Sequence, residues 1–171
     1  METVTITITK QPELFLEAEC FIPDALAGKT AEEIAELPVH IGRTTEKVGD
    51  YFTVQGAAGA TAEETKLVLN GDFSRVKYIG SKMTAGEVVV NGDADMYVGA
   101  WMTGGKITVN GSIGHFAATS MEGGEIHVTG NAGNYLAASY RGDWRGMKGG
   151  RIVVDGNVGS DCGTFMVGGE I

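Results

Sequence analysis

The stretch Gly104–Gly111, with the sequence GGKITVNG, is one copy of a repeat that covers most of the chain. Strands of the same pattern begin at Lys66, Glu87, Lys106, Glu125 and Arg151, and a further copy begins at Glu170. A methionine lies two residues before each pair of small residues that precedes a strand, at Met83, Met102, Met121, Met147 and Met166. The intervals between these methionines are 19, 19, 26 and 19 residues, a period that predicts a solenoid.

Each copy alternates apolar and polar residues, as Ile107, Thr108 and Val109 do, which is typical of a strand with one buried face. A unit of this length has no room for a helix beside the strand and its glycine turns. Because one unit cannot bury its apolar face alone, successive units must stack. The sequence therefore predicts an all-β fold, a right-handed, parallel β-helix-like solenoid of about 19-residue coils with a small N-terminal α+β cap.

Stacking would place equivalent residues in columns along the axis. The first residue of each strand alternates in charge, from Lys66 and Glu87 to Arg151 and Glu170. Opposite charges would then be neighbours, and each exposed pair would contribute about 0.2–1 kcal/mol, more to the register than to stability. The methionines should stack inside. A further column is suited to side-chain hydrogen bonds at a turn and contains Asn70, Asn91, Asn110, Thr129 and Asp155.

We expect two regions in the chain. Residues 1–48 are interpreted as an N-terminal capping region of strands plus a short helix, and residues 49–171 as the β-helix repeat domain. Segment 49–56 resembles the repeat and is interpreted as the first, irregular coil. The last copy stops two residues into a strand at Ile171, so we expect the repeat to continue beyond this residue or another chain to cover it.

The capping region itself contains three recognisable segments. Residues 1–9 alternate cleanly and are interpreted as an edge or capping strand, and residues 14–22 as a second strand. Thr30 and Glu33 form a capping box, which predicts a short helix that ends near Leu37.

The composition narrows the class of partner. The net charge of −9 at pH 7 argues against nucleic acid or an anionic membrane as a partner. The sequence contains no signal peptide and no apolar run long enough to cross a bilayer, so we expect a cytoplasmic protein. Cys20 and Cys162 form no disulfide or metal-ligand framework and are interpreted as core thiols.

One coil breaks the period, because the segment Tyr140–Gly146, with the sequence YRGDWRG, is inserted between Ser139 and Met147. Insertions in repeat proteins lie on one face, often the binding face. This insertion combines arginines with aromatic residues, the types enriched at interface hot spots. A glycine-rich loop packed on its own neighbours is the alternative. The sequence predicts a binding role for this loop rather than a catalytic one.

Candidates for metal or acid–base chemistry are few. His40, His115 and His127 fall in three different columns, which argues against a metal site of the usual spacing. Asp72 and Asp93 share a column, and paired carboxylates could bind Ca²⁺ or act as general acid and base. The same column continues with Ser112, Asn131 and Asn157. This composition favours a turn ladder instead.

Nucleotide-binding and calcium-binding signatures are also missing. The chain contains neither a Walker A sequence nor a Rossmann fingerprint. Its period differs from that of the calcium-binding nonapeptide repeat. The sequence therefore predicts no catalytic, cofactor-binding or metal-binding residue on this chain.

Three motifs carry a resemblance to a known family. They are the repeat Met-x-Gly-Gly-x-Ile-x-Val-x-Gly-x-x-Gly, the segment GDFSRVKYIG at 71–80 and the segment ASYRGDWRGMKGG at 138–150. The chain resembles, over essentially its whole length, the C subunit of formylmethanofuran dehydrogenase. The glycine repeat is also similar to that of the glutamate synthase large subunit, and the inserted loop makes the narrower assignment. The same subunit type occurs in the formyltransferase/hydrolase complex.

The resemblance implies a structural subunit of a cytoplasmic complex of methanogenic archaea. That complex reduces CO₂ at a molybdenum or tungsten pterin centre supplied by iron–sulfur clusters, and attaches the product to methanofuran at a binuclear metal site. These cofactors are expected in other subunits and none on this chain. The implied partners are the amidohydrolase-like subunit and the Mo/W subunits. The expected interface residues are those of the loop, namely Tyr140, Arg141, Asp143, Trp144 and Arg145.

Functions of other classes remain open at this point. One is the C subunit of the formyltransferase/hydrolase complex. Another is a standalone carbohydrate-active β-helix enzyme, such as a polysaccharide lyase, with Asp72, Asp93 and the arginines as its site; such enzymes are usually secreted. A third is an adhesin-like structural solenoid, which would leave the loop of arginines and aromatic residues unexplained.

Overall fold

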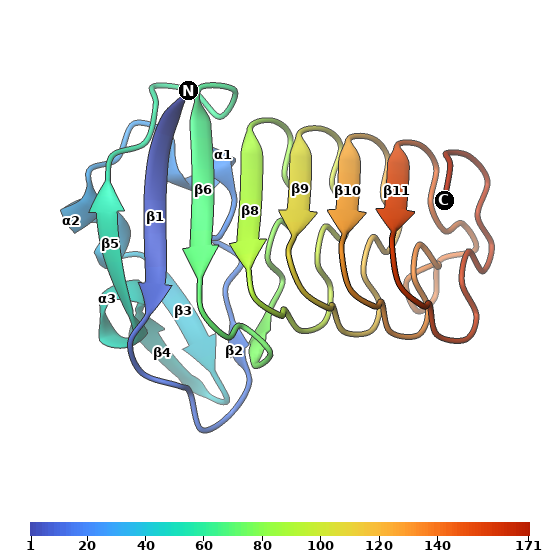
Figure 1. The fold of residues 1–171 in the computed structure, drawn as a ribbon, viewed down its shortest axis with the longest axis horizontal. Helices are drawn as coiled ribbons and strands as arrows, with labels where there is room; N and C mark the ends of the chain where they lie inside the picture. Colours follow the sequence, from blue (N-terminus) through green and yellow to red (C-terminus); the bar gives the residue numbers. More distant parts are fainter.

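The computed structural model describes residues 1–171, which form a mostly β chain with three short helices (Figure 1). In chain order, the elements are β1 (Glu2–Ile8), β2 (Leu16–Glu17), α1 (Pro23–Leu26), α2 (Ala31–Ala35), β3 (Pro38–Ile41), β4 (Thr44–Lys47), α3 (Val48–Tyr51), β5 (Phe52–Gly56), β6 (Thr65–Asn70), β7 (Val76–Lys77), β8 (Glu87–Asn91), β9 (Lys106–Val109), β10 (Glu125–Val128) and β11 (Arg151–Val154).

The larger sheet has the strand order β11-β10-β9-β8-β6-β1-β5. Every pair of neighbouring strands from β1 to β11 in this sheet is parallel, and only the pair of β1 and β5 is antiparallel. The register joins equivalent residues of successive copies, so that Ile107 pairs with Val88 on one side and with Ile126 on the other. A one-copy step along the sequence is therefore a one-strand step across the sheet.

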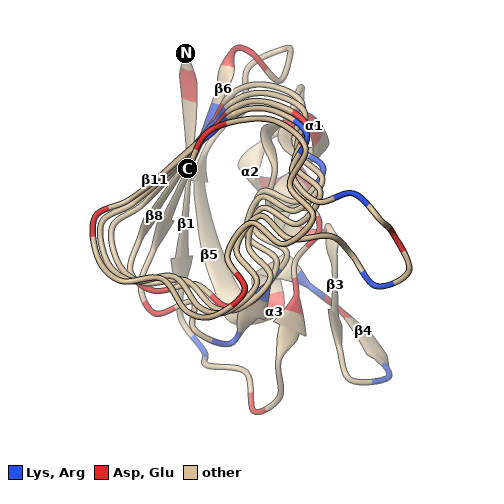
Figure 2. Cartoon of the chain, turned by 90° about the vertical axis from the view of Figure 1, so that its right-hand side faces the viewer, with Lys and Arg blue, Asp and Glu red and all other residues tan.

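The segments between the strands are also paired. A row of parallel bridges joins one residue of each copy to the next, and its members are Phe73, Ala94, Ile113, Ala132 and Val158. Viewed along the row of strands, the copies lie over one another as nested outlines (Figure 2). Because both the strands and the connecting segments pair from copy to copy, most of the chain consists of stacked parallel coils.

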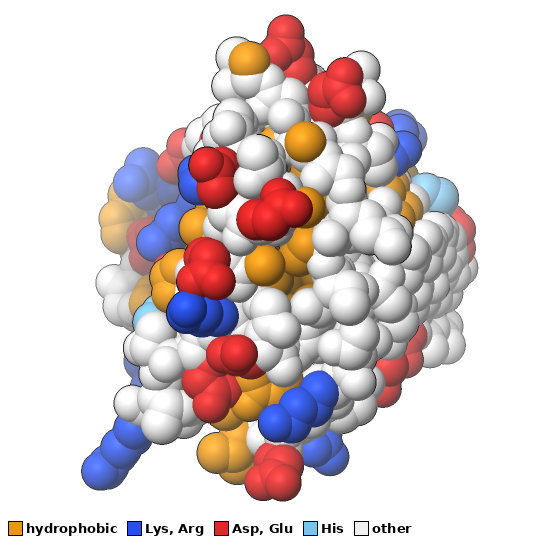
Figure 3. Space-filling view, turned by 90° about the vertical axis from the view of Figure 1, so that its left-hand side faces the viewer, with side chains coloured by type: hydrophobic (Ala, Val, Ile, Leu, Met, Phe, Trp, Pro, Cys, Tyr) orange, Lys and Arg blue, Asp and Glu red, His pale blue; other side chains and the backbone are white.

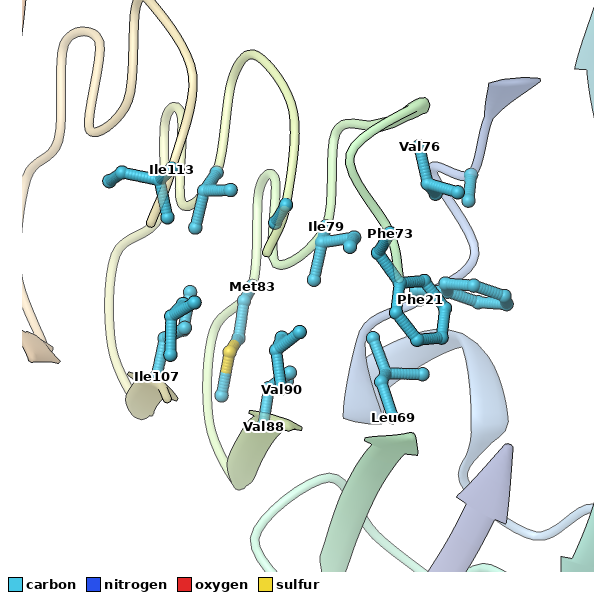
Figure 4. Packing of buried hydrophobic residues seen from close by; sticks show 14 of the residues in the cluster. Phe21, Leu69, Phe73, Val76, Ile79, Met83, Val88, Val90, Ile107 and Ile113 are labelled. Atoms are coloured by element: carbon cyan, nitrogen blue, oxygen red, sulfur yellow. The ribbon is translucent and has the colours of Figure 1, made fainter. Parts of the chain in front are cut away.

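The core runs through the middle of these coils. Met83, Met102, Met121 and Met147 are fully buried, and Met166 packs partly buried against the same cluster. They pack beside the inward-facing residues of the strands, as Met83 does near Val88 and Ile107 (Figure 4). Each fully buried side chain of this size contributes about 1.5–3 kcal/mol. The predicted column of stacked methionines is confirmed.

From Gly105 onward, the methionines explain the second glycine of each small pair. A Cβ at Gly124 would lie 2.7 Å from the Met102 Cε of the preceding coil, and the backbone there has φ +88°. Both the space and the backbone angle therefore require glycine at this position.

The column of alternating charges is confirmed, and the turn column is confirmed for its three asparagines, whereas Asp155 lies against His127 instead. The register places Lys66 beside Glu87 and continues the alternation of sign through Arg151, with a Lys66–Glu87 distance of 3.4 Å. Asn91 donates a hydrogen bond to the Asn70 Oδ1 at 2.9 Å, and Asn110 donates to the Asn91 Oδ1 at 2.9 Å.

The N-terminal region differs from the predicted arrangement. The strand at residues 1–9 is present as β1, but it lies between β5 and β6 rather than at an edge. The interpretation of residues 49–56 as the first coil is wrong, because they contain most of α3 and all of β5. The Asp50 carboxylate accepts a hydrogen bond from the Lys47 N–H at 3.0 Å and starts the helical turn, after which β5 pairs antiparallel with β1.

The other predictions for this region have mixed outcomes. The capping box is confirmed: the Glu33 N–H donates to the Thr30 Oγ1 at 3.3 Å, and the Thr30 N–H donates to the Glu33 carboxylate at 3.0 Å. The strand predicted at 14–22 is reduced to β2, because Leu14 and Phe15 are exposed and turns follow from residue 19.

A second, four-stranded sheet has the order β4-β3-β2-β7 and joins this region to the coils. Figure 3 shows the end of the molecule formed by the N-terminal elements, where acidic and basic side chains surround hydrophobic ones. None of the helices is long and apolar enough to cross a membrane.

Candidate partner-binding surface

The inserted loop 140–146 leaves the stack between Ser139 and Met147 and extends well beyond the outline of the coils (Figure 2). Its shape is held by short-range hydrogen bonds. The Asp143 N–H donates to the Tyr140 carbonyl at 2.9 Å, and the Asp143 Oδ1 accepts from the Arg145 N–H at 3.1 Å. The Gly146 N–H donates to the Phe165 carbonyl at 2.7 Å and returns the chain to the stack.

The loop presents aromatic side chains to solvent. The Trp144 side chain is 71% exposed, and Tyr140 is 46% exposed. The Arg145 guanidinium lies 4.8 Å from the centre of the Trp144 ring, a cation–π pair. Of the predicted interface residues, the structure brings Trp144 and Arg145 together at the loop tip and leaves Tyr140 at its base.

A column of aromatic rings lies beside the loop base. Tyr78, Tyr97, Phe116 and Tyr135 stack with successive ring centres 4.9, 5.4 and 5.2 Å apart and interplanar angles of 6–13°. This column was not predicted from the sequence. Its signal is present there, since the four aromatic residues recur at intervals of 19 residues.

The residues that carry these rings have a backbone conformation that bulky residues rarely adopt. Tyr78, Tyr97, Phe116 and Tyr135 have φ between 60° and 69°, and Trp101 has φ 57°. Each left-handed residue with a side chain costs about 1–2 kcal/mol. Aromatic pairs contribute about 0.5–1.5 kcal/mol beyond their buried area, so stacking offsets part of this cost.

Two surface hollows meet at Tyr140. The smaller, of about 250 Å³, is lined by Tyr97, Phe116, Ser139, Tyr140 and Arg141. The larger, of about 530 Å³, is lined by Glu19, Tyr78, Ser81, Lys82, Trp101 and Tyr140. Aromatic rings and a cation therefore line both hollows, and aromatic residues and arginine are types that are enriched at protein interfaces.

Burial keeps the phenols of Tyr78 and Tyr97 protonated at neutral pH. Burial raises the pKa of Tyr97 above its ordinary value, Tyr140 adds to the increase, and the Arg141 charge opposes it. Burial likewise raises the pKa of Tyr78, with a contribution from Tyr97. Both groups are therefore neutral hydrogen-bond donors toward anything that enters the hollows.

The aspartate column has a structural role. The Asp93 Oδ1 accepts a hydrogen bond from the Ser112 N–H of the next coil at 2.8 Å. The Ser112 Oγ accepts from the Asn131 N–H at 3.0 Å, and the Asn131 Oδ1 accepts from the Asn157 N–H at 2.8 Å. Each side chain thus binds the backbone of the following coil, which confirms the predicted turn ladder.

The three histidines do not meet. His115 Nδ1 accepts from the Asn134 N–H at 2.8 Å, His127 Nε2 lies 2.9 Å from the Asp155 carboxylate, and His40 Nδ1 lies 3.2 Å from Thr45 Oγ1. No group of three or more His, Cys, Asp or Glu side chains is arranged to hold a metal ion.

The two cysteines differ from each other. Cys20 packs against the core, and burial raises its pKa to about 12. Cys162 is exposed, so its interpretation as a core thiol is wrong. The preceding coils bury the equivalent residues Val98, Ala117 and Leu136 between neighbours, whereas no described coil lies over Cys162.

Comparison with known proteins places this surface in context. No protein-family model matches the chain. The C subunit of the tungsten-containing formylmethanofuran dehydrogenase 2 of Methanococcus maripaludis is 58% identical over 132 residues, which cover 77% of this chain and 47% of that protein. Its counterpart in Methanothermobacter wolfeii is 46% identical over 96 residues, which cover 56% of this chain and 36% of that protein.

Molybdenum enzymes occur among the relatives too. The C subunit of the molybdenum-containing formylmethanofuran dehydrogenase 1 of Methanosarcina barkeri is 43% identical over 96 residues, 56% of this chain and 32% of that protein. The chain thus spans less than half the length of these curated relatives.

A solved structure is similar over nearly the whole chain. It is a chain of the formyltransferase/hydrolase complex of Methylorubrum extorquens, crystallised in complex with methylofuran, with a TM-score of 0.86 and 26% identity. The match covers 95% of this chain and 59% of that one. The curated homologues of this chain are the C subunits of formylmethanofuran dehydrogenases, which confirms the resemblance inferred from the glycine repeat and the inserted loop.

Proposed function

We propose that this chain acts as the structural, non-catalytic C subunit of a formylmethanofuran dehydrogenase, the complex that reduces CO₂ and attaches it as a formyl group to methanofuran. The observation that carries the proposal is the inserted loop. This chain is a homologue of such C subunits, and its loop exposes Trp144 and Tyr140 to solvent on a turn that is held by its own hydrogen bonds. Tryptophan, tyrosine and arginine are the residue types enriched at interface hot spots, so the exposed loop suits contact with a partner subunit.

The stacked coils suit a supporting role. We propose that they form a right-handed parallel β-helix solenoid within the predicted repeat domain of residues 49–171, from β6 onward, with residues 1–48 and the antiparallel β5 as its cap. Each coil pairs with its neighbours both along the strands and along the row of bridges in the connecting segments. The stack is therefore rigid, and the loop projects from a rigid base.

The partner at the loop is proposed to be the amidohydrolase-like subunit, with the Mo/W subunits as further members of the assembly. Trp144 and Arg145 would be the hot spots, because tryptophan and arginine in a desolvated contact each contribute about 2 kcal/mol or more. Tyr140, Arg141 and Asp143 would form the surrounding contacts.

The redox cofactors of such an assembly do not fit the residues of this chain. An iron–sulfur cluster is held by four thiolates or by two thiolates and two imidazoles, and this chain brings no three of its Cys, His, Asp or Glu side chains together. The molybdenum or tungsten pterin, the iron–sulfur clusters and the binuclear metal site are therefore proposed to lie in other subunits of a cytoplasmic complex.

Co-purification tests the proposal. The chain, tagged and expressed with the other subunits, should bring down an amidohydrolase-like subunit. The double variant Arg141→Ala/Arg145→Ala should reduce that yield at least about tenfold. The matched control Lys106→Ala/Arg151→Ala removes two exposed cations from the strand face instead and should leave the yield unchanged. An intact complex with normal turnover in the loop variant contradicts the proposal.

The same purification distinguishes a second candidate, which the similarity to the formyltransferase/hydrolase complex favours. Molybdenum or tungsten with abundant iron in the purified assembly supports the dehydrogenase. Zinc without a redox metal supports the hydrolase complex.

A further inference from the structure

The proposed function assigns a role to the inserted loop but none to the aromatic rings beside its base. We define the aromatic face as the four-ring column together with Trp101 and Tyr140; its members are Tyr78, Tyr97, Trp101, Phe116, Tyr135 and Tyr140. Trp101 lies nearly parallel to Tyr97, with ring centres 6.1 Å apart, and Tyr140 meets Trp101 edge-on at 5.1 Å. The aromatic face is therefore continuous with the base of the inserted loop.

Internal packing accounts for only part of this arrangement. Stacking between coils explains the column of Tyr78, Tyr97, Phe116 and Tyr135. It does not explain Trp101, because the equivalent positions of the neighbouring coils are Lys82 and Ser120. Lys82 and Ser120 share the left-handed conformation of Trp101, so the turn requires this backbone but not an aromatic ring, and the indole is available for a role at the surface.

The charges around the aromatic face identify what fits it. The chain has a net charge of −9, yet the smaller hollow is lined by Arg141 and by no carboxylate. Three rings, the Ser139 hydroxyl and the Arg141 guanidinium surround about 250 Å³. This volume holds one large side chain. A guanidinium that lines the same hollow as aromatic rings suits a carboxylate carried on an apolar stem.

The larger hollow complements the smaller one. Lys82 lies 6.0 Å from the centre of the Trp101 ring, and Tyr78 and Trp101 supply apolar surface. Glu19 is the one acidic lining residue, and it contributes to the larger hollow alone. Together the two hollows offer apolar contact with a cation in each.

We propose that the aromatic face binds an acidic, apolar-rich segment of the partner subunit, with a Glu or Asp side chain seated against Arg141 between Tyr97, Phe116 and Tyr140. This inference rests on the proposed function, since it assigns a chemistry to the partner of the same assembly. The loop tip and the aromatic face then form one docking surface, with Tyr140 common to both.

Site-specific photo-crosslinking tests which segment lies on the aromatic face. Tyr135 is replaced by p-benzoylphenylalanine in the full chain, within the assembly with which it co-purifies, because this ring is 39% exposed at the edge of the column. Mass spectrometry should identify a crosslinked peptide of another subunit that contains Glu or Asp beside apolar residues. The control carries the same residue at Thr108, on the outward face of β9, and should give no crosslink to that peptide.

The charge of Arg141 gives an independent readout. The dissociation constant of the chain for the remaining subunits should rise about tenfold for Arg141→Gln, and at least about tenfold further for Arg141→Glu, because the new carboxylate repels the bound one. Arg141→Lys should recover part of the affinity. Arg141 is exposed, so these variants fold.

The outcomes separate this inference from the proposed function. An assembly that forms while Tyr135 crosslinks only to its own chain, to a second copy or to a basic segment overturns the inference and leaves the function standing. Equal affinities of Arg141→Gln and Arg141→Glu overturn it as well. Failure of the unsubstituted chain to assemble overturns both.

Discussion

The ring of Tyr140 meets the indole of Trp101 edge-on, with ring centres 5.1 Å apart and an interplanar angle of 66°. Tyr140 begins the inserted loop, and Trp101 belongs to a coil two copies earlier in the sequence. This contact joins the loop base to the rigid stack. The orientation of the loop therefore depends on a residue that lies far outside the insertion.

Trp101→Ala should free the loop from the stack. We expect faster amide hydrogen exchange in residues 140–145 and unchanged exchange in β8. Because Trp101 is half-buried, the free energy of unfolding should fall by about 2 kcal/mol, less than the 3–5 kcal/mol typical of a fully buried tryptophan. Trp101→Phe keeps an aromatic edge for Tyr140 and should retain slow exchange in the loop. Slow exchange in Trp101→Ala would show that the loop is positioned by its own hydrogen bonds.

Gly124→Ala should destabilise the coils through a clash with the preceding coil. The new Cβ would lie 2.7 Å from both the Met102 Cε and the Gly105 carbonyl oxygen, in a residue with φ +88°. We expect a loss of about 3 kcal/mol, the sum of backbone strain and overpacking, measured by urea unfolding.

The matched control for this change is Gly28→Ala. Its backbone has φ +75°, but a Cβ there would meet no heavy atom within 4 Å. Only the strain of the left-handed backbone remains, so we expect the free energy of unfolding to fall by about 1 kcal/mol. Equal losses in the two variants would mean that both the methionine and the backbone of the preceding coil move aside.

Asn91→Ala should cost more than Asn70→Ala. Asn91 both donates to Asn70 and accepts from Asn110, each at 2.9 Å, whereas Asn70 takes part in one side-chain bond of this ladder. At about 0.5–1 kcal/mol for each exposed bond, the first change should cost about 1–2 kcal/mol and the second half of that. Urea unfolding of both variants checks the ratio. Equal values would assign the stability to the turn backbone instead.

The period explains why these columns could be predicted. Once copies are equivalent and parallel, every position of the repeat becomes a column, so Asn70 is placed beside Asn91 without further information. The aromatic column at Tyr78 follows from the same rule, but it lies outside the strands, where the alternating pattern gives no signal. The left-handed backbone that carries it could not be predicted, since bulky residues normally avoid that region.

In the N-terminal region, by contrast, the alternating pattern predicts a strand but not its direction. Phe52 and Val54 alternate with polar residues as the repeat does, and β5 is indeed a strand. Alternation is the same in parallel and antiparallel strands, so the pattern contains no information about direction. The preceding helical turn at Val48–Tyr51 reverses the chain and makes β5 antiparallel to β1.

The two thiols should react with iodoacetamide at very different rates. Burial raises the pKa of Cys20 to about 12, so almost none of it is thiolate at pH 8, whereas Cys162 is exposed despite a pKa that is also raised by burial. We expect mass spectrometry of the native chain to find Cys162 modified first, and Cys20 modified only after unfolding in urea. Cys162→Ser should therefore give a native chain that is nearly inert.

The raised pKa of Cys20 also makes the free energy of unfolding depend on pH. The thiol of Cys20 binds its proton more tightly in the folded than in the unfolded chain, so its contribution is complete below the unfolded pKa near 9 and is lost as the pH rises from there toward 12. Cys20→Ala should flatten that part of the stability curve, measured by urea unfolding between pH 8 and pH 11. Rapid alkylation of native Cys20 at pH 8, or an unchanged slope in Cys20→Ala, would show that the thiol reaches solvent through opening of the N-terminal turns around it.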